Sequence, residues 1–192
     1  RMLWPDGPAL GSIALSPSSA EAPDSSLSFM IDLFARALAG PATFHFTGGR
    51  LDLDGLAATC AAARAADRPA LVMGASFAFV HLVDTGERAA FALPRGSRVM
   101  QTGGFKGRSR EVDAADLRAG IASTFAGPEA RVIGEYGMTE LPSQLYEAAR
   151  SGPGVYGPPP CLGVRAADPV TLDVLPAGRE GMVKRLTEAI EG

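Results

Sequence analysis

Cysteine and lysine are both scarce in this sequence. Among its 192 residues, Cys60 and Cys161 are the only cysteines, and they lie far apart, outside any CxxC or cysteine–histidine pattern. We therefore expect neither a disulfide scaffold nor a structural zinc site. Lys106 and Lys184 are the only lysines, so nearly all of the basic charge is carried by arginine.

Long apolar runs and an excess of basic charge are also missing. No apolar stretch approaches the roughly 18–20 residues that a membrane-spanning helix needs. No basic flank followed by an apolar segment marks a secretory signal. The formal net charge is −3 and the pI is near 5.4, whereas dedicated nucleic-acid-binding domains are usually basic. We expect a cytoplasmic globular protein with no membrane span and no nucleic-acid partner.

The sequence does contain enough apolar material for a sizeable core. Hydrophobic residues make up 46% of the chain and charged residues 20%, which excludes wholesale disorder. Short strands and helices alternate, with glycines after the strands, as is typical of a largely parallel α/β sheet flanked by helices. Strands are predicted at 42–47, 70–73, 97–102 and 131–133, and helices at 27–38, 53–66, 76–83 and 113–125.

Both ends of the chain differ from this alternation. Residues 1–25 are rich in proline, glycine and serine, which predicts a loop-rich opening segment. Residues 151–160 predict a loop or linker, and strands at 162–166 and 181–183 predict a small β segment. The expected organisation is an α/β core at 1–150, a loop and small β subdomain at 151–183, and a terminal segment of open placement at 184–192.

Three segments follow predicted strands, at the sheet edge where α/β proteins bind ligands. They are Gly74-Ala75-Ser76, the glycine-rich stretch from Thr102 to Gly107, and the stretch from Gly134 to Glu140.

The stretch from Gly134 to Glu140 combines groups that suit a nucleotide. A purine can stack on Tyr136, Gly137 lets the backbone approach a ligand, and Thr139 can donate to a phosphate oxygen. Glu140 can hold Mg²⁺, which takes oxygen ligands and bridges to phosphates. The same residues also fit a strand-to-helix turn with a capping threonine and a first-turn glutamate. The residues alone leave both interpretations open.

The glycine-rich stretch suits an anion, because backbone amides near Gly103 and Gly104 lie close in sequence to Lys106. It lacks the GxxxxGK[ST] order of a Walker A loop. A flexible turn with solvated charges is the alternative.

The histidines and cysteines are weaker candidates for chemistry. His45 and His81 fit structural histidines in a strand and an apolar helix better than catalytic bases. Cys60 fits a packed helix position. Cys161 has no electropositive neighbours in the sequence that would lower the pKa of a reactive thiol.

Several of these motifs together resemble one enzyme superfamily. Residues 134–140 resemble the YGxTE motif of adenylate-forming enzymes, which include acyl-CoA synthetases and nonribosomal adenylation domains. Residues 101–107 are similar to a GG-aromatic-KG segment of the LuxE-like acyl-protein synthetase branch, near the phenylacetate-CoA ligases. Residues 26–30 resemble the opening of that branch's middle region. Residues 168–181 resemble its DPxTL…LPxGxxG hairpin.

The resemblance implies ATP-dependent activation of a carboxylic acid, expected to be a fatty acid, to an acyl-adenylate. The acyl group then passes to a thiol, either CoA or a protein cysteine, and an acyl reductase is a conceivable partner. By position, Thr139 contacts the α-phosphate and Glu140 binds Mg²⁺. The residues that the resemblance places around ATP are Thr102, Gly103, Gly104, Glu135, Tyr136, Gly137 and Met138, and those near the acyl pocket are Gly74, Ala75, Ser76, His81 and Lys106.

Parts of the family pattern have no match here. The phosphate loop, the ribose-binding aspartate, the C-terminal lobe and its catalytic lysine are not seen, so we expect these residues to be incomplete for catalysis. An acyl- or aryl-CoA ligase is the alternative enzyme, and a non-catalytic nucleotide-binding module is the alternative class. A Rossmann-type domain is disfavoured because no GxGxxG follows a strand.

Overall fold

The computed structural model describes residues 11–38, 42–103, 107, 109–127, 131–137, 143–147, 153–160 and 162–186. The chain divides into two compact units, Arg1–Gly134 and Glu135–Gly192. The domain limits predicted from composition, after residues 150 and 183, stay predictions.

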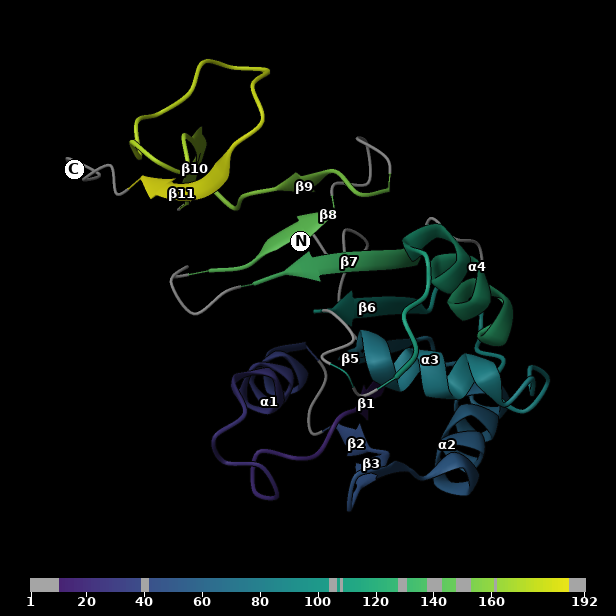
Figure 1. Ribbon diagram of the computed structural model, residues 1–192. Helices are drawn as coiled ribbons and strands as arrows, with labels where there is room; N and C mark the ends of the chain where they lie inside the picture. The colour runs from purple at the N-terminus through teal and green to yellow at the C-terminus, as the bar shows by residue number, and fades with distance from the viewer. Residues whose placement is uncertain are drawn as a thin grey trace. The chain divides into compact units, whose positions relative to one another are not determined.

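A mostly parallel sheet forms the centre of the first unit (Figure 1). Its strands lie in the order β2-β1-β5-β6-β7. β1 pairs in parallel with β2 and with β5, and β5 pairs in parallel with β6. The predicted α/β class with a largely parallel sheet is thereby confirmed. The strand bounds are β1 Gly11–Leu15, β2 Thr43–Phe44, β5 Ala70–Ala75, β6 Arg98–Thr102 and β7 Val132–Tyr136.

The prediction that residues 1–25 are a loop-rich opening segment is wrong at β1. Gly11–Leu15 lies between β2 and β5, and Ile13, Ala14 and Leu15 are almost fully buried. The prolines and serines on either side of this short run hide it in the sequence. Five residues with no clear alternation become a strand because two neighbouring strands pair with them.

The predicted strand at 42–47 is divided into two short strands at His45. Residues before His45 form β2 in the main sheet, whereas Phe46–Thr47 (β3) pairs with Arg50–Leu51 (β4) as an antiparallel hairpin. The turn is Gly48-Gly49, and both glycines have positive φ, as tight hairpin turns require.

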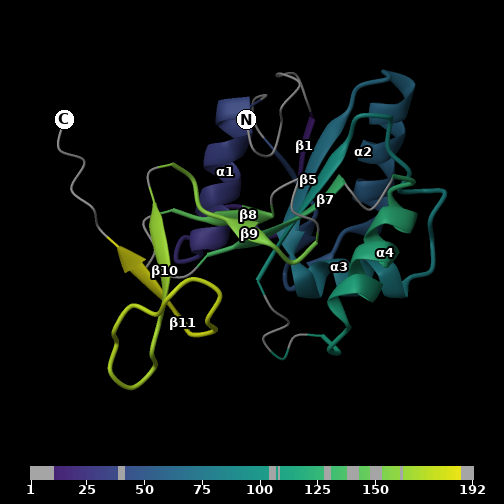
Figure 2. The ribbon, with the colours of Figure 1, turned by 90° about the horizontal axis from the view of Figure 1, so that it is seen from above.

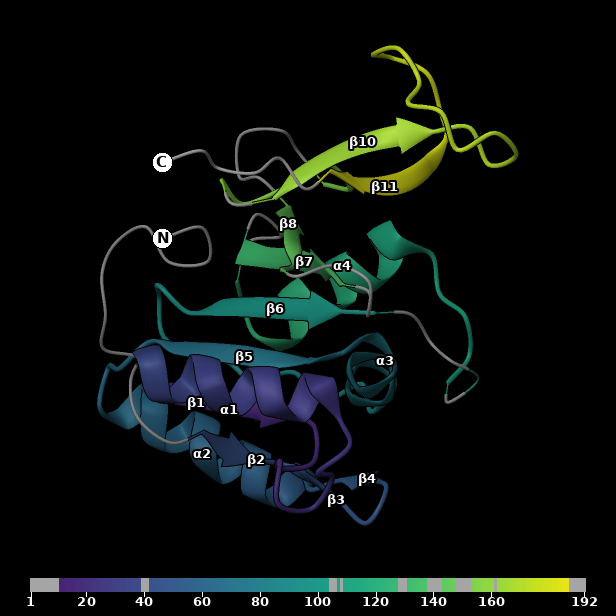
Figure 3. The same cartoon turned by 90° about the vertical axis from the view of Figure 1, so that its left-hand side faces the viewer.

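The helices lie on both faces of the sheet of the first unit. α1 covers one face, and α2, α3 and α4 cover the other (Figures 1 and 2). Figure 3 shows α1 in front of β1 and β5. The helix bounds are α1 Ser26–Leu38, α2 Leu53–Ala65, α3 Ser76–Asp84 and α4 Ala114–Thr124, all close to the predicted ranges.

Side-chain caps determine where three of these helices begin. Ser25 Oγ accepts from the backbone amide of Ser28 at the start of α1. Asp52 accepts from the amide of Gly55 in α2. Asp113, predicted as a cap, accepts from the amides of Ala115 and Asp116 in α4. Each cap satisfies amides that have no partner within the helix.

The main core lies between the sheet and helices α2 to α4. Apolar side chains from β1 and β5 pack there with buried residues of all three helices. On the other face, Ile31 and Ala35 of α1 are fully buried, whereas Phe29 and Leu33 are exposed. The largest side chains of the main core that are almost completely buried are Ile13, Leu15, Leu56, Phe79, Leu82, Phe91, Leu117 and Ile121.

The second unit begins inside β7. Glu135 and Tyr136 pair antiparallel with Leu145–Glu147 (β8), which in turn pairs antiparallel with Tyr156–Gly157 (β9). The sequence predicted a strand over 131–133 that ends at Gly134, and this end is wrong. Pairing with β8 extends β7 through the glycine to Tyr136. β9 likewise lies within a stretch that had been predicted as a loop.

The predicted pair of strands near the carboxyl end is confirmed. Gly163–Ala167 (β10) and Met182–Leu186 (β11) form an antiparallel hairpin, in which Ala167 lies opposite Met182. Gly181 has no room for a side chain, because a Cβ there would lie 2.5 Å from the carbonyl oxygen of Ala167. This close approach explains the glycine at the end of the DPxTL…LPxGxxG resemblance.

Candidate functional site

The carboxyl ends of β5 and β6 lie side by side in the first unit. Ala75, the last residue of β5, is the direct partner of Thr102, the last residue of β6. Two of the three segments predicted to bind a ligand, Gly74–Ser76 and the start of 102–107, therefore meet at one edge of the sheet. Parallel pairing brings them together, because strands of equal direction end at the same edge.

The hydroxyl of Ser76 connects these two strand ends. Ser76 Oγ lies 3.2 Å from the carbonyl oxygen of Thr102 and also contacts the carbonyl oxygen of Gly103. It accepts a hydrogen bond from Nε2 of Gln101 at 2.9 Å. Ser76 is 1% exposed, so its hydroxyl faces protein atoms rather than solvent. Gln101 was not among the residues predicted for the site, because the sequence does not reveal which side chains of β6 face Ser76.

Gly103 presents open backbone at this edge. Its φ is +68°, and a Cβ built there would meet no atom of the described residues within 4 Å. The glycine is required by its conformation, since this region of φ favours residues without a side chain. No described residue therefore occupies the position that a side chain of residue 103 would take.

Gly74 and Ala75 face the protein interior instead. A Cβ at Gly74 would lie 2.9 Å from Cβ of Leu15 and 3.2 Å from the carbonyl oxygen of Leu15. Gly74 is buried, and Ala75 is 8% exposed. Close packing of β5 against β1 is thus the physical reason for the glycine at 74.

His81 lies on the exposed side of α3. Its ring packs edge-on against Phe77, with the ring centroids 6.4 Å apart. It therefore lies one turn along the helix from Phe77, which itself contacts Phe46.

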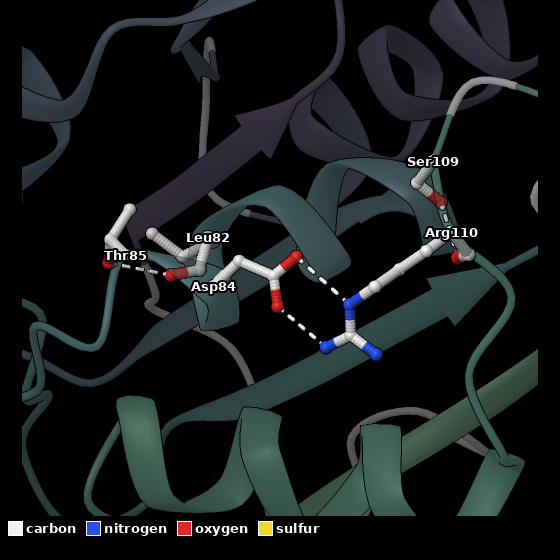
Figure 4. A network of polar contacts seen from close by, with 5 residues as sticks. All are labelled: Leu82, Asp84, Thr85, Ser109 and Arg110. Carbon is white, nitrogen blue, oxygen red and sulfur yellow. Dashed lines mark hydrogen bonds and ion pairs between the residues drawn. The ribbon is translucent and has the colours of Figure 1, made fainter.

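The carboxyl end of α3 contacts the chain again beyond the glycine-rich stretch. Asp84, the last residue of α3, accepts two hydrogen bonds from the guanidinium of Arg110, at 2.6 and 3.2 Å (Figure 4). The hydrogen bond from Arg110 lowers the pKa of Asp84 below its ordinary value. The sequence did not suggest this pair, whose members lie 26 residues apart.

In the second unit, the tyrosine of the YGxTE resemblance has an accessible ring. Tyr136 is 40% exposed and lies tilted against Tyr156, with ring centroids 6.1 Å apart. Its position at the end of β7 leaves a planar aromatic surface for a flat ligand such as a purine.

Glu135, the neighbour of Tyr136 in β7, is a buried acid. It is 5% exposed, and burial raises the pKa of its carboxyl to about 7. Its Oε1 lies 2.8 Å from where a Cβ of Gly137 would be, so the carboxyl packs against the glycine backbone. Across the strand pair lies Tyr146, whose pKa is raised by burial and by the Glu135 charge.

Five of the predicted site residues lie outside the described residues. They are Gly104, Lys106, Met138, Thr139 and Glu140. Their roles stay predictions from the resemblance. Within the described part of the chain, no group of three or more histidine, cysteine or acidic side chains is placed to hold a metal ion.

His45 and Cys60 are both buried in the first unit. His45 is 6% exposed, its Nε2 lies 3.1 Å from Oγ1 of Thr59, and burial lowers its pKa. Burial raises the pKa of the Cys60 thiol to about 11, which leaves it protonated and unreactive at neutral pH.

A small cavity lies away from the candidate site, at the amino ends of β6 and β7. Its walls include Leu93, Ser97, Phe125 and Val132, and its volume is about 20 Å³. A space of this size holds roughly one water molecule and excludes a nucleotide.

No helix among the described residues is long and apolar enough to span a bilayer.

No family model and no curated protein matches the sequence. Among solved structures, the fold is similar to the ATP-bound RpMatB-BxBclM chimera B3, with a TM-score of 0.62 and 19% identity over 94% of this chain. It is also similar to apo MatB from Rhodopseudomonas palustris, with a TM-score of 0.60 and 16% identity over 92% of this chain. MatB is an adenylate-forming enzyme.

The chain has the fold of part of an adenylate-forming enzyme. It matches part of each of these two structures and spans 32% of the length of each. The LuxE-like branch stays a prediction, because neither of these structures tests it.

Proposed function

We propose that this chain is the nucleotide- and acid-binding part of a ligase that uses ATP to activate a carboxylic acid as an acyl-adenylate and passes the acyl group to a thiol. The observation that carries the proposal is the edge formed by β5 and β6. There Thr102 and the open backbone of Gly103 lie beside Ser76, in a fold similar to an ATP-bound structure.

The residues present suit the parts of ATP that they are proposed to meet. Gly103 offers backbone that a ligand can approach closely, and Tyr136 offers an exposed ring for adenine. The reaction joins two anions, a carboxylate and the α-phosphate, so the protein mainly has to position them and offset the developing charge. The roles of Thr139 at the α-phosphate and of Glu140 at Mg²⁺ rest on the resemblance, and Mg²⁺ when bound would screen phosphate charge.

Two acceptors distinguish the candidate enzymes. The sequence resemblance favours a fatty acid passed to a protein cysteine, with an acyl reductase as a conceivable partner. The likeness to MatB, an acyl-CoA ligase, favours an acid passed to CoA.

ATP–pyrophosphate exchange on the intact protein, with a panel of fatty, aryl and short dicarboxylic acids, tests the proposal. Exchange that depends on one acid class supports adenylation and names the substrate. Adding CoA or a cysteine-containing acceptor protein then shows which thiol takes up the radiolabelled acyl group. ATP binding with no exchange for any acid would replace the ligase with a non-catalytic nucleotide-binding module.

Tyr136→Ala is expected to weaken ATP binding about tenfold, because stacking of a base on an aromatic ring contributes roughly 1–3 kcal/mol. Tyr136→Phe keeps the ring and is expected to bind within about twofold of the parent protein. Isothermal titration with ATP measures both variants. An unchanged dissociation constant for Tyr136→Ala would contradict the stacking role.

A further inference from the structure

Helix α3 contacts the connection between β6 and α4 at both of its ends. Its first residue, Ser76, contacts the carbonyl oxygens of Thr102 and Gly103, where the connection begins. Its last residue, Asp84, is paired with Arg110, just before α4. The two contacts lie at opposite ends of one nine-residue helix.

The contact at the amino end of α3 is buried, and the Ser76 hydroxyl both donates and accepts hydrogen bonds there. The Ser76 hydroxyl has one hydrogen to donate, which the carbonyl oxygens of Thr102 and Gly103 share, and its lone pair accepts from Gln101. With the side chain 1% exposed, water cannot replace a lost partner there. Removing the hydroxyl takes this donor away from the carbonyl oxygens of Thr102 and Gly103, and the loss of a hydrogen bond is costly in a buried place.

The contact at the carboxyl end is exposed but has well-defined geometry. Figure 4 shows both carboxylate oxygens of Asp84 facing Nε and one terminal nitrogen of Arg110. A carboxylate at a helix carboxyl terminus is disfavoured by the helix dipole, and the arginine offsets this. The side chains are 41% and 58% exposed, and exposed pairs of this kind add little to overall stability. The pair can therefore direct the chain without being needed for folding.

Helix α3 is itself a rigid reference for both contacts. Ala78, Phe79 and Leu82 are fully buried in the main core. Gly120 of α4 approaches α3 so closely that a Cβ there would lie 2.9 Å from Val83. A segment that is hydrogen-bonded to either end of α3 therefore has a fixed position relative to the sheet of the first unit.

We propose that Ser76 and the Asp84–Arg110 pair are positioning residues that fix both ends of the β6–α4 connection on helix α3, so that the backbone at Thr102 and Gly103 is preset to receive the nucleotide. The inference deepens the proposed function and rests on it. None of the three side chains needs to touch ATP. Their contribution is to lower the conformational cost of ordering the connection when the nucleotide binds.

The first arm of the test needs no nucleotide. Amide hydrogen exchange in a peptide that covers residues 101–112 is compared for the parent, Ser76→Ala and Arg110→Asp. Both variants are expected to exchange about tenfold faster there, as loss of a local restraint allows local opening. Ser28→Ala is the matched control for Ser76, because Ser28 is a fully buried serine whose hydroxyl has no hydrogen-bond partner among the described residues. Arg95→Asp controls for charge reversal at an exposed arginine.

The second arm measures ATP binding and the use of ATP in pyrophosphate exchange. Ser76→Ala and Arg110→Asp are expected to raise the ATP dissociation constant, and the KM for ATP in pyrophosphate exchange, about tenfold while kcat changes less than about twofold. The charge-swapped double variant Asp84→Arg/Arg110→Asp restores the pair in reverse and is expected to recover ATP affinity to within about twofold. If Ser76→Ala does not fold, the variants of the exposed Asp84–Arg110 pair alone test the proposal.

The outcomes separate this inference from the proposed function. A parent protein that binds no ATP refutes the proposed function, and with it the nucleotide role. Unchanged exchange at 101–112 in both variants refutes the anchoring. Faster exchange with unchanged ATP affinity, or a double variant that fails to recover, refutes the positioning role.

Discussion

A Glu135→Gln variant is expected to gain unfolding free energy relative to the parent, by up to roughly 3 kcal/mol, as the pH rises from about 5 to about 8. Burial raises the pKa of the Glu135 carboxyl from an ordinary value of 4.5 to about 7. Below the lower value both the folded and unfolded states are protonated, and stability is complete. As the pH rises, the unfolded chain ionises first and gains solvation that the folded chain lacks, so stability falls until the folded carboxyl ionises too.

Urea unfolding at several pH values measures this effect, together with hydrogen exchange of the β7 and β8 amides, which reports on the second unit. Glutamine has nearly the shape of the protonated acid and cannot ionise. Glu180→Gln, at an exposed position, is the control and is expected to follow the parent. Equal pH slopes for Glu135→Gln and the parent would mean that the buried carboxyl does not titrate in this range.

The same carboxyl bears on the site. Glu135 precedes Tyr136, and its Oε1 packs against the backbone of Gly137. The substitution that is expected to raise stability above neutral pH therefore lies next to the exposed ring of Tyr136. The ATP titration proposed for Tyr136 can be repeated on this variant to show whether the neutral side chain alters nucleotide affinity.

Gly74→Ala is expected to destabilise the first unit by about 2–3 kcal/mol, at the upper end of the cost of overpacking a well-packed interior. The new methyl group would lie 2.9 Å from Cβ of Leu15 and 3.2 Å from the Leu15 carbonyl oxygen. The second of these is backbone of the neighbouring central strand, which cannot move without disturbing β1. The gain from replacing a glycine in a strand, roughly 0.5–1 kcal/mol, does not offset the clash.

Gly11→Ala provides a matched control in the adjacent strand. A Cβ at Gly11 would lie 3.8 Å from Cβ of Ala70, an ordinary contact distance, so this variant is expected to be neutral or slightly stabilised. Thermal unfolding followed by far-ultraviolet circular dichroism compares the two variants with the parent. Equal melting temperatures for the two variants would show that β1 and β5 separate easily at Gly74.

Much of the first unit was predictable from local sequence signals. These signals act within a few residues: Asp113 before an amphipathic run, the glycines after short apolar strands, and the Gly48-Gly49 turn. The helices and most strands begin and end close to them. Two of the predicted ligand segments, Gly74–Ser76 and the start of 102–107, also meet as expected. Parallel strands must end at a common edge, which makes this meeting predictable from strand order.

The sequence by itself determined the fold class, the alternation of helices and strands, and the positions of the YGxTE-like and glycine-rich segments. Only the tertiary structure decided that Gly11–Leu15 is a central strand, that β7 continues through Gly134, and that Ser76 faces Thr102 and Gly103 rather than solvent. The physical reason is the same in each case. Strand pairing, burial and hydrogen bonding with partners in other elements set these features, and local propensity carries no information about those partners.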